Sequence, residues 1–364
     1  MTDSAPKKRI GILTSGGDCP GLNATIRAAT HAALDKGWEV VGILNSTEGM
    51  MADPIACMPL DHQTVDNVFR IGGTILGTTS KGAQSPLNFP RGDGTTYDRS
   101  QEVADAYHKL GLNGLVVIGG DGSMGILRQI AERTDLKFVG IPKTIDNDVG
   151  ATEQSIGFDT AFAVAAEAID RLQPTAASHQ RVMILEVMGR DAGHIALNAG
   201  IAGGADVILI PELAYTLDGV CEKITKLKAQ GRNNALIVVA EGVKGVGGEK
   251  LQVKHNDGQM RLGGIGQYLA AGIAEKIGAE ARVTVLGHVQ RGAAPNAMDR
   301  LIATASGVHA FSLIEKGEYD RMVIWKNRSV TSVPLAEALE TYHTVDTNHA
   351  LVTSARGMGI YIGE

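Results

Sequence analysis

The sequence of 364 residues is poor in cysteine and contains no long apolar run. Its three cysteines, Cys19, Cys57 and Cys221, form no CxxC pair, which excludes a disulfide framework and a cysteine-ligated zinc site. No run approaches the ~20 apolar residues of a membrane span, and the polar N-terminus lacks the apolar core of a signal peptide. We therefore expect a cytoplasmic protein without a membrane partner.

Aromatic residues and excess positive charge are also scarce. Phe, Trp and Tyr together make up 4% of the chain, so aromatic platforms on which nucleic-acid bases stack are few. The formal net charge is −6, and a phosphate backbone would be repelled overall. Nucleic acid is therefore not an expected partner, whereas local basic pockets for small anions remain compatible with this composition.

The chain is rich in apolar segments that alternate with helical stretches. With 44% hydrophobic residues it can bury a full core, and its length favours two domains. Continuous apolar runs predict strands that are covered on both faces, and the βα alternation predicts an α/β fold with two doubly wound, Rossmann-like domains. These strands are expected at residues 10–13, 40–44, 115–118, 138–141, 182–187, 207–210, 235–240 and 283–286, with helices at 158–171 and 219–229.

Two polar segments follow neighbouring predicted strands, namely Gly119-Gly120-Asp121-Gly122-Ser123 and Pro142-Lys143-Thr144-Ile145-Asp146-Asn147-Asp148. Both would lie at the carboxyl edge of one parallel sheet, where open α/β folds bind ligands. Glycine turns admit phosphate oxygens, and carboxylates there can hold Mg²⁺ or accept a proton. Simpler interpretations exist for each segment alone: Asp121 as a helix N-cap, residues 146–148 as an Asx turn, and Lys143 as a solvated charge.

A third glycine turn follows the first predicted strand and includes Gly16, Gly17 and Asp18. A turn of this kind before a helix can present N–H groups to an anion, although many βα turns use glycine only for geometry. Residues 120–125 formally match the dinucleotide fingerprint G-x-G-x-x-G, but the charge of Asp121 would repel a metal-free pyrophosphate. Cys19 is interpreted as a small buried residue because no histidine is near it in sequence.

Basic residues recur beside the later strands. His179-Gln180-Arg181 precedes one strand and Met188-Gly189-Arg190 follows it, and Arg282 and His288-Val289-Gln290-Arg291 flank another. Arginine forks bind phosphate in a bidentate manner, so these segments could together hold a sugar phosphate. Taken singly, each basic residue is better explained by a surface ion pair, and His288 by a hydrogen-bonded structural histidine.

Taken together, these segments closely resemble the phosphofructokinase family along nearly the whole chain. The resemblance rests on residues 11–18, 119–123, 142–148, 178–181, 186–190 and 285–292, which occur in the family's order. It implies 6-phosphofructokinase activity, in which the γ-phosphoryl group of ATP passes to the 1-hydroxyl of fructose 6-phosphate. The products would be fructose 1,6-bisphosphate and ADP, and the reaction belongs to glycolysis.

The resemblance also implies roles for individual residues. The catalytic set would be Asp146 as general base, Asp148, Arg190 and Thr144, with Asp121 as the Mg²⁺ ligand. The nucleotide phosphates would be held by Gly17, Ser80, Lys81, Gly120, Asp121, Gly122 and Ser123. Fructose 6-phosphate would be held by Thr144, Ile145, Asp146, Arg181, Met188, Gly189, Arg190, Glu241, Arg282, His288 and Arg291.

The same resemblance bears on domains and assembly. It implies a nucleotide-binding domain of residues 1–155 plus about 275–320, and a sugar-phosphate-binding domain of residues 156–274 plus the C-terminal segment, with the active site in the cleft between them. The family's counterparts of Arg181 and Arg282 reach in from a neighbouring subunit, so a homotetramer with shared active sites is expected. Regulation as an allosteric enzyme is also typical of the family.

Two positions bear on the phosphoryl donor. Family members that use pyrophosphate typically carry Asp at the position of Gly122 and Lys at that of Lys143, and many bacterial ATP users have Gly at both. Gly122 leaves room for the α-phosphate of a nucleotide, so we expect ATP as donor. A pyrophosphate-dependent enzyme and a non-catalytic sugar-phosphate sensor are the alternatives.

Some positions depart from the family pattern. Lys81 stands where many bacterial members have an arginine, and His31 stands where an effector-site arginine is expected, as does Gln173, whereas Arg27 is retained. Activation by ADP and inhibition by phosphoenolpyruvate of the usual kind are therefore not expected.

Overall fold

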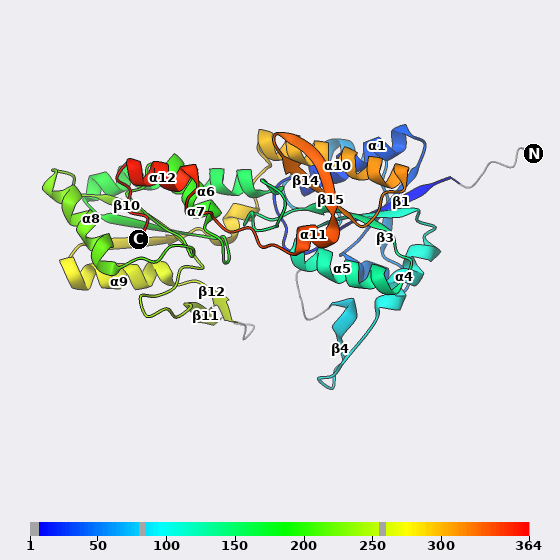
Figure 1. Cartoon of the computed structure of the whole chain (residues 1–364), viewed down its shortest axis with the longest axis horizontal. Helices are drawn as coiled ribbons and strands as arrows, with labels where there is room; N and C mark the ends of the chain where they lie inside the picture. The colour runs from blue at the N-terminus through cyan, green and yellow to red at the C-terminus, as the bar shows by residue number, and fades with distance from the viewer. Residues whose placement is uncertain (1–6, 80–84, 255–259, 364) are drawn as a thin grey trace, which may run out of the picture. The chain divides into compact units, whose positions relative to one another are not determined.

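The computed structural model describes residues 7–79, 85–254 and 260–363. The chain divides into two compact units, which are described separately (Figure 1). The first unit holds Met1–Thr144, Val149–Asp159 and Arg291–Tyr342, and the second holds Ile145–Asp148, Thr160–Gln290 and His343–Glu364. Which ligand each unit binds stays a prediction. No helix in the described ranges has the length and apolar character that a membrane span requires.

The first unit is built on a seven-stranded sheet with the order β15-β14-β7-β6-β1-β2-β3. The strands from β14 to β2 pair in parallel, and the edge strands β15 and β3 pair antiparallel. The strands are β1 (Arg9–Thr14), β2 (Glu39–Ile43), β3 (Cys57–Pro59), β6 (Gly114–Gly119), β7 (Phe138–Pro142), β14 (Arg321–Lys326) and β15 (Ser329–Pro334). Two shorter strands, β4 (Phe89–Pro90) and β5 (Thr96–Tyr97), form a separate hairpin.

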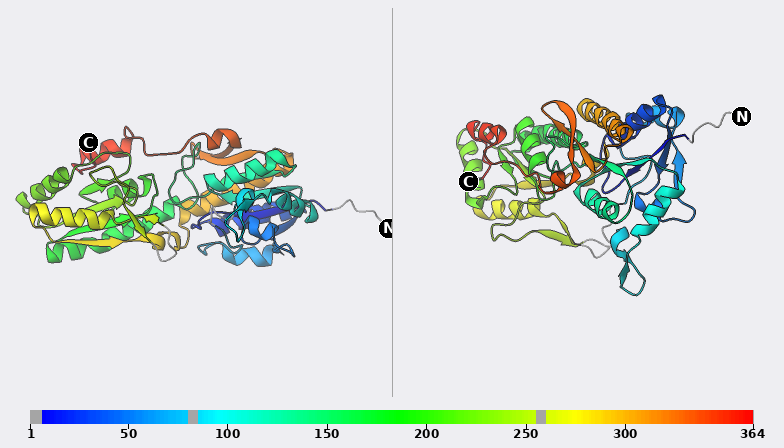
Figure 2. Two further views of the ribbon diagram at one scale, coloured as in Figure 1. Left: turned by 90° about the horizontal axis from the view of Figure 1, so that it is seen from below. Right: turned by 45° about the vertical axis from the view of Figure 1, so that its right-hand side comes forward.

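Helices cover both faces of this sheet. Figures 1 and 2 show α1 and α10 side by side on one face, and α4 and α5 on the other. All residues of β6 and β7 are buried, which explains their continuous apolar sequences. The helices of this unit are α1 (Leu22–Asp35), α2 (Thr47–Met50), α3 (His62–Val65), α4 (Ser100–Lys109), α5 (Asp121–Arg133), α10 (Ala297–Lys316) and α11 (Leu335–Leu339), with the 3₁₀ turns η1 (Asp66–Val68) and η3 (Pro86–Asn88).

The second unit has a four-stranded parallel sheet with the order β13-β8-β10-β9. Its strands are β8 (Val182–Val187), β9 (Val207–Leu209), β10 (Ala235–Ala240) and β13 (Ala281–Val285), and a hairpin of β11 (Gln252–Lys254) and β12 (Met260–Leu262) is separate from them. The helices are α6 (Phe158–His179), which begins in the first unit, α7 (His194–Ala202), α8 (Leu217–Ala229), α9 (Ile265–Ile277) and α12 (Ala350–Gly357), with η4 (Gly287–Arg291) at the border of the units.

A buried carboxylate fixes one helix of this second unit to its sheet. Glu186 near the end of β8 is 2% exposed, and its two carboxylate oxygens accept hydrogen bonds from the backbone N–H groups of Gly264 (3.1 Å) and Gly266 (2.9 Å). These groups belong to the N-terminal end of α9, where N–H groups lack partners within the helix. A negative charge at this position also suits the helix dipole.

The predicted α/β fold with two doubly wound sheets is confirmed, and every strand that the apolar runs predicted is present. The antiparallel pair of β14 and the edge strand β15 was not predicted, although β14 contains the buried apolar run Met322–Ile324. No residue of β15, from Ser329 to Pro334, is buried and half of its residues are polar, which explains why a search for continuous apolar runs does not find it.

Candidate active site

Three turns of the first unit lie together at the carboxyl edge of its sheet. They follow β1, β6 and β7, which are adjacent parallel strands, as the sequence predicted for the last two. Ser15 N donates to Ile118 O at 2.9 Å, and Lys143 N donates to Gly119 O at 3.0 Å, so the turns after β1 and β7 are both anchored to β6. This edge therefore brings Gly17, Gly120–Ser123 and Lys143 into one region.

The turn after β1 requires glycine for its conformation. Gly16 has φ +85°, and a Cβ atom there would lie 3.1 Å from Lys143 Nζ and 3.4 Å from Ser123 Oγ. The turn is also tied to the segment before residue 80: Gly16 N donates to Thr79 O at 3.0 Å, and Thr78 Oγ1 donates to Gly16 O at 2.6 Å. Ser80 and Lys81, two of the predicted phosphate-binding residues, lie outside the described residues.

Lys143 is buried and not a solvated surface charge. It is 3% exposed, and its ammonium donates a hydrogen bond to the backbone carbonyl of Gly17. The surface interpretation of this residue was therefore wrong. A buried cation beside the two glycine turns gives this edge of the sheet a fixed positive charge, which suits phosphate oxygens.

Asp121 is the first residue of α5, and Gly120 is the N-cap. The N-cap interpretation of Asp121 was therefore wrong. Its Oδ1 accepts a hydrogen bond from Gly122 N at 2.7 Å, and the residue is exposed. Mg²⁺ is commonly held by one or two carboxylates together with water and substrate phosphates, and an exposed carboxylate at a helix N-terminus beside glycine turns fits that donor set.

Gly122 and Gly125 both lie on α5 with open space around them. A Cβ atom at either position would meet no heavy atom within 4 Å. A side chain at position 122 would therefore be compatible with the fold, and it would occupy the open space at the N-terminal end of the helix.

The segment with Asp146 and Asp148 forms a bend and not an extended strand end. Asn147 between the two carboxylates has φ +54°, a left-handed conformation that asparagine tolerates. Asp146 is 7% exposed and Asp148 is 3% exposed, and both belong to the second unit together with the fully buried Ile145. Thr144, whose N–H donates to Ile156 O at 3.2 Å, belongs to the first unit.

A histidine that the sequence analysis missed holds this bend. His343 Nδ1 donates to Asn147 O at 2.9 Å, and the backbone N–H of His343 donates to Asp148 O at 2.9 Å. His194 Nε2 in turn donates to His343 O at 3.1 Å, and the two rings lie 4.6 Å apart. Burial, and next the charge of His343, lowers the pKa of His194 to about 4. No sequence signal links these residues, because they are almost 200 positions apart.

The second unit gathers another set of predicted residues at the carboxyl ends of its strands. Met188-Gly189-Arg190 follows β8, Glu241 follows β10 and His288 follows β13. Arg190 N donates to Glu241 Oε1 at 3.2 Å, and Arg190 has φ +54°. A non-glycine residue in this conformation is uncommon and is often found at functional sites.

The side chain of Gln290 holds the loop at Met188 through a hydrogen bond. This residue was not among the predicted site residues. It is fully buried, its Oε1 accepts from Met188 N at 2.8 Å, and its Nε2 donates to Ala161 O at 3.4 Å. A polar residue beside an apolar strand was visible in the sequence, but its partner in another segment was not.

Arg181 and Arg282 lie at the opposite end of the same sheet. Arg181 immediately precedes β8, and Arg282 is in register with Met183 at the start of that strand. Both arginines pair with Glu280, Arg181 at 3.0 Å, and the hydrogen bond from Arg181 is the main cause that lowers the pKa of Glu280. A six-residue strand is about 20 Å long, so these arginines do not join Met188 and Arg190 within one chain.

Arg291 and Cys19 border the turn after β1. Arg291 Nη1 donates to Asp18 O at 2.9 Å, and a Cβ atom at Gly17 would lie 3.0 Å from the same nitrogen. Cys19 is fully buried, and burial raises its pKa to about 12. Its thiol donates to Ile156 O at 3.3 Å, so the interpretation of Cys19 as a structural residue is confirmed.

The chain belongs to the phosphofructokinase family, whose family model matches residues 9–314. Among curated relatives, "ATP-dependent 6-phosphofructokinase 1" of Nostoc sp. is 57% identical over 98% of this chain and 99% of its own length. The protein of the same name from Synechocystis sp. is 55% identical over 98% of both chains. The predicted family membership is thus confirmed over nearly the full length.

Solved structures agree on the fold. The phosphofructokinase of Saccharomyces cerevisiae is similar with a TM-score of 0.78 and 28% identity, and the match covers 92% of this chain but only 45% of the longer yeast chain. A pyrophosphate-dependent phosphofructokinase from Nitrosospira multiformis has a TM-score of 0.79 at 19% identity, covering 98% of this chain and 93% of that one. At that identity the second likeness concerns the fold alone.

Proposed function

We propose that this chain is an ATP-dependent 6-phosphofructokinase. It transfers the γ-phosphoryl group of ATP to the 1-hydroxyl of fructose 6-phosphate and produces fructose 1,6-bisphosphate and ADP. The observation that carries this proposal is the 57% identity, over 98% of the chain, to a relative named as an ATP-dependent 6-phosphofructokinase. The glycine turns and carboxylates described above supply groups that this chemistry needs.

The carboxyl edge of the first sheet is the proposed site of the donor. N–H groups of the turns at Gly17 and Gly120–Ser123 would hold the nucleotide phosphates, and Asp121 would hold Mg²⁺. When bound, the ion neutralises charge on the phosphates during transfer. Lys143 adds a buried cation at this edge, and Ser80 and Lys81 complete the proposed set.

The carboxyl edge of the second sheet is the proposed site of the sugar phosphate. Glu241 would accept hydrogen bonds from sugar hydroxyls, and Arg190 and His288 would face the phosphate or the developing charge. The proposed set also includes Thr144, Ile145, Met188, Gly189 and Arg291.

The chemical step requires one base and charge stabilisation. Asp146 would accept the proton of the 1-hydroxyl as the oxygen–phosphorus bond forms, while the bond from the γ-phosphorus to the bridging oxygen breaks and ADP leaves. Asp148 supports this base, and Arg190 would stabilise charge on the transferred group. No covalent intermediate on the enzyme is needed, so catalysis comes from positioning and electrostatics.

A shared active site in a homotetramer is the proposed assembly. Arg181 and Arg282 lie at the far end of the sheet from Met188, so they could act on a sugar phosphate only in a neighbouring copy of the chain. The apolar side chains of Val285 on edge strand β13 and of Val289 are 53% and 66% exposed, which is consistent with a surface that another subunit covers. Allosteric control is proposed on family membership alone.

A cytoplasmic location is proposed with the glycolytic role. The three cysteines are free, and Cys19 and Cys221 are buried, as suits a reducing compartment.

A direct assay tests the function. The purified chain is incubated with fructose 6-phosphate and Mg²⁺, with either ATP or pyrophosphate as donor, and fructose 1,6-bisphosphate is measured. We expect product with ATP and at least ~10²-fold lower kcat/KM with pyrophosphate, because Gly122 leaves space for a nucleotide. Product with pyrophosphate alone would replace the donor assignment, and binding of sugar phosphate without turnover would favour the sensor.

A further inference from the structure

Two histidines and an aspartate lie together on the first unit, and none of them belongs to the proposed catalytic or substrate-binding residues. One of them, His31, stands where the family resemblance implies an effector-site arginine. The three side chains are His31 on α1, His62 at the start of α3 and Asp66 at the start of η1. One ligand atom from each lies within 4.8 Å of the other two. His31 Nε2 is 2.7 Å from Asp66 Oδ1, and the rings of His31 and His62 stand edge to face with centroids 4.6 Å apart.

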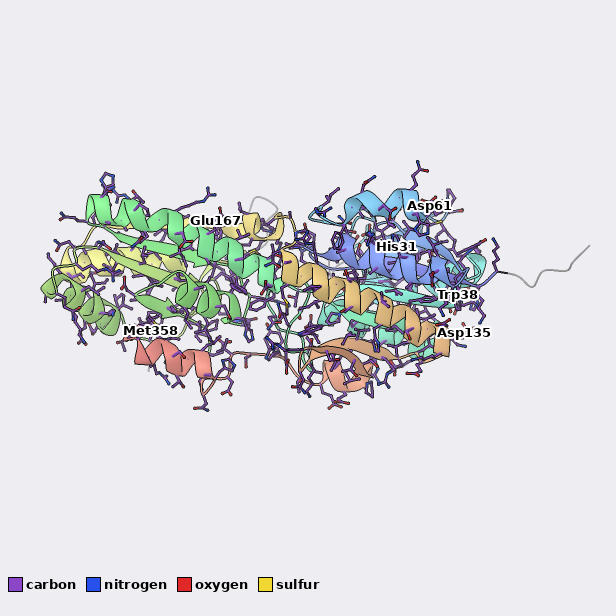
Figure 3. All side chains as sticks on the ribbon, turned by 90° about the horizontal axis from the view of Figure 1, so that it is seen from above. His31, Trp38, Asp61, Asp135, Glu167 and Met358 are labelled. Atoms are coloured by element: carbon purple, nitrogen blue, oxygen red, sulfur yellow. The ribbon has the colours of Figure 1, made fainter. Side chains whose placement is uncertain are left out.

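The local structure delivers these groups from two separate segments. Asp61 caps α3 through its side chain, which accepts from Thr64 N at 2.8 Å, and this cap fixes His62 as the first residue of the helix. Figure 3 labels His31 on α1 and Asp61, which immediately precedes α3, on a separate segment. A ligand shared by His31 and His62 would therefore join α1 to the segment of α3 and η1.

The donor set has the chemistry of a transition-metal site. Two imidazoles and one carboxylate are ligands that Zn²⁺ binds tetrahedrally, with bonds of about 2.0–2.2 Å and water in a remaining position. Ligand atoms around such an ion are about 3.3 Å apart. The pair at 2.7 Å would open slightly, and no pair would have to close by more than about 1.5 Å. Because His62 and Asp66 are exposed, rotation of their side chains can supply this movement.

A second histidine–aspartate pair in the same unit shows what an ordinary surface pair looks like. His108 Nε2 on α4 lies 2.7 Å from Asp135 Oδ1, the same distance as between His31 and Asp66. His108 and Asp135 are not part of any group of three potential ligands in the described chain. The presence of His62 is what distinguishes the first pair from the second.

Neighbouring arginines oppose a cation: besides Arg27, both Arg70 and Arg300 lie over the Phe69 ring, 5.8 Å and 5.6 Å from its centroid. Arg27 Nε is 3.9 Å from Asp66 Oδ1, and its guanidinium stacks on Phe69 at 5.3 Å from the ring centroid. A guanidinium at this distance competes for the carboxylate and repels a divalent ion, so it should weaken the site without removing its ligands.

We propose that His31, His62 and Asp66 bind one Zn²⁺-class divalent transition-metal ion. The bound ion cross-links α1 to the segment of α3 and η1. Helix α1 follows the glycine turn at residues 16–18. This proposal does not depend on the enzymatic function, because its ligands are none of the proposed catalytic or substrate-binding residues.

Metal binding to the full chain, freed of metal with a chelator, tests the proposal. Zn²⁺ is titrated calorimetrically, and Co²⁺ is used as a spectroscopic probe because its visible absorption reports nitrogen and oxygen ligands. We expect one ion per chain at this site and at least tenfold weaker binding in each of His31→Ala, His62→Ala and Asp66→Asn. His108→Ala is the matched control and should bind Zn²⁺ like the parent chain.

A second measurement separates a lost ligand from a damaged fold. A hundredfold excess of Zn²⁺ over its Kd should raise the melting temperature of the parent and of His108→Ala by on the order of 5 °C, and should leave His62→Gln unchanged. Arg27→Gln should bind Zn²⁺ a few-fold more tightly, because an opposing charge is gone. Equal binding in the parent and in folded His31→Ala and His62→Ala chains would overturn the proposal, and so would equal loss in His108→Ala.

Discussion

The carboxyl edges of the two sheets hold their proposed ligands by different means. The edge of the first sheet uses glycine turns, main-chain groups and one buried ammonium, that of Lys143. The edge of the second sheet uses side chains on a loop with a left-handed arginine, Arg190, supported by the buried amide of Gln290. Ligand binding at the edge of the first sheet should therefore be sensitive to added bulk or negative charge. Ligand binding at the edge of the second sheet should be sensitive to the loss of a supporting hydrogen bond.

The largest expected effect comes from the bend between Ile145 and Asp148. Asp146→Asn removes the proposed base while keeping shape and burial, so kcat should fall by at least ~10²-fold, with binding of fructose 6-phosphate largely intact. Steady-state kinetics and calorimetric binding of the sugar phosphate measure the two quantities. Unchanged turnover would reject Asp146 as the base.

A negative charge added at the carboxyl edge of the first sheet should weaken binding of the phosphoryl donor and leave binding of the sugar phosphate unchanged. Gly122→Asp adds a carboxylate where the space is open, so the fold should be kept while KM for ATP rises on the order of 50-fold through repulsion of the phosphates. Gly125→Asp is the matched control, since it also points into open space one turn further along α5. Equal effects of the two variants on KM would contradict a donor site at the start of the helix.

Acid should destabilise the second unit through His194. Its pKa is lowered to about 4 by burial and by His343, whereas the unfolded chain takes up the proton near the ordinary value of 6.5. The unfolded state therefore binds more protons between these values, and stability falls as the pH drops from about 7 toward 4. The loss between pH 7 and pH 5 should be roughly 2 kcal/mol, a change of about 30-fold in the unfolding equilibrium.

Urea unfolding at both pH values, monitored by circular dichroism, checks this. His194→Asn should lose much of the pH dependence while retaining that of the carboxylates. If the variant and the parent chain lose the same free energy between pH 7 and pH 5, His194 is not the group responsible.

The smallest effect is expected from His343, which holds the bend between Ile145 and Asp148. His343→Ala removes the donor to Asn147 O and should lower kcat about fivefold to tenfold, which is the value of one hydrogen bond, with KM for ATP unchanged. His343→Gln, which keeps a donor, should recover part of the loss. A fall in stability with no change in kcat would make His343 a purely structural residue.

The sheets were predictable from sequence because their signal is local. Continuous apolar runs such as Leu115–Ile118 in β6 and Phe138–Ile141 in β7 are long enough to predict buried parallel strands. The polar segments that follow these strands are then expected at the same edge of the sheet. The fold was therefore available without coordinates, whereas the candidate site residues came from the resemblance to the family and stay predictions.

The environment of the side chains was not available in the same way. Lys143 is buried because a carbonyl 126 positions away accepts its hydrogen bond, and Asp146 and Asp148 lie in a bend that His343 holds from the other end of the chain. The local sequence pattern indicates which secondary structure a residue favours. Whether its side chain is buried or exposed depends on partners that are distant in the sequence. Gln290 and His343 were missed for this reason.

Gln290 and Arg291 are neighbours in sequence, yet they belong to different units. The side chain of Gln290 accepts a hydrogen bond from the backbone N–H of Met188, and the side chain of Arg291 donates one to the backbone carbonyl of Asp18. One peptide bond thus joins the residue that supports the loop at Met188 to the residue that supports the turn at Asp18. A residue inserted between positions 290 and 291 would shift at least one of these two side chains away from its backbone partner, even if each sheet folded normally.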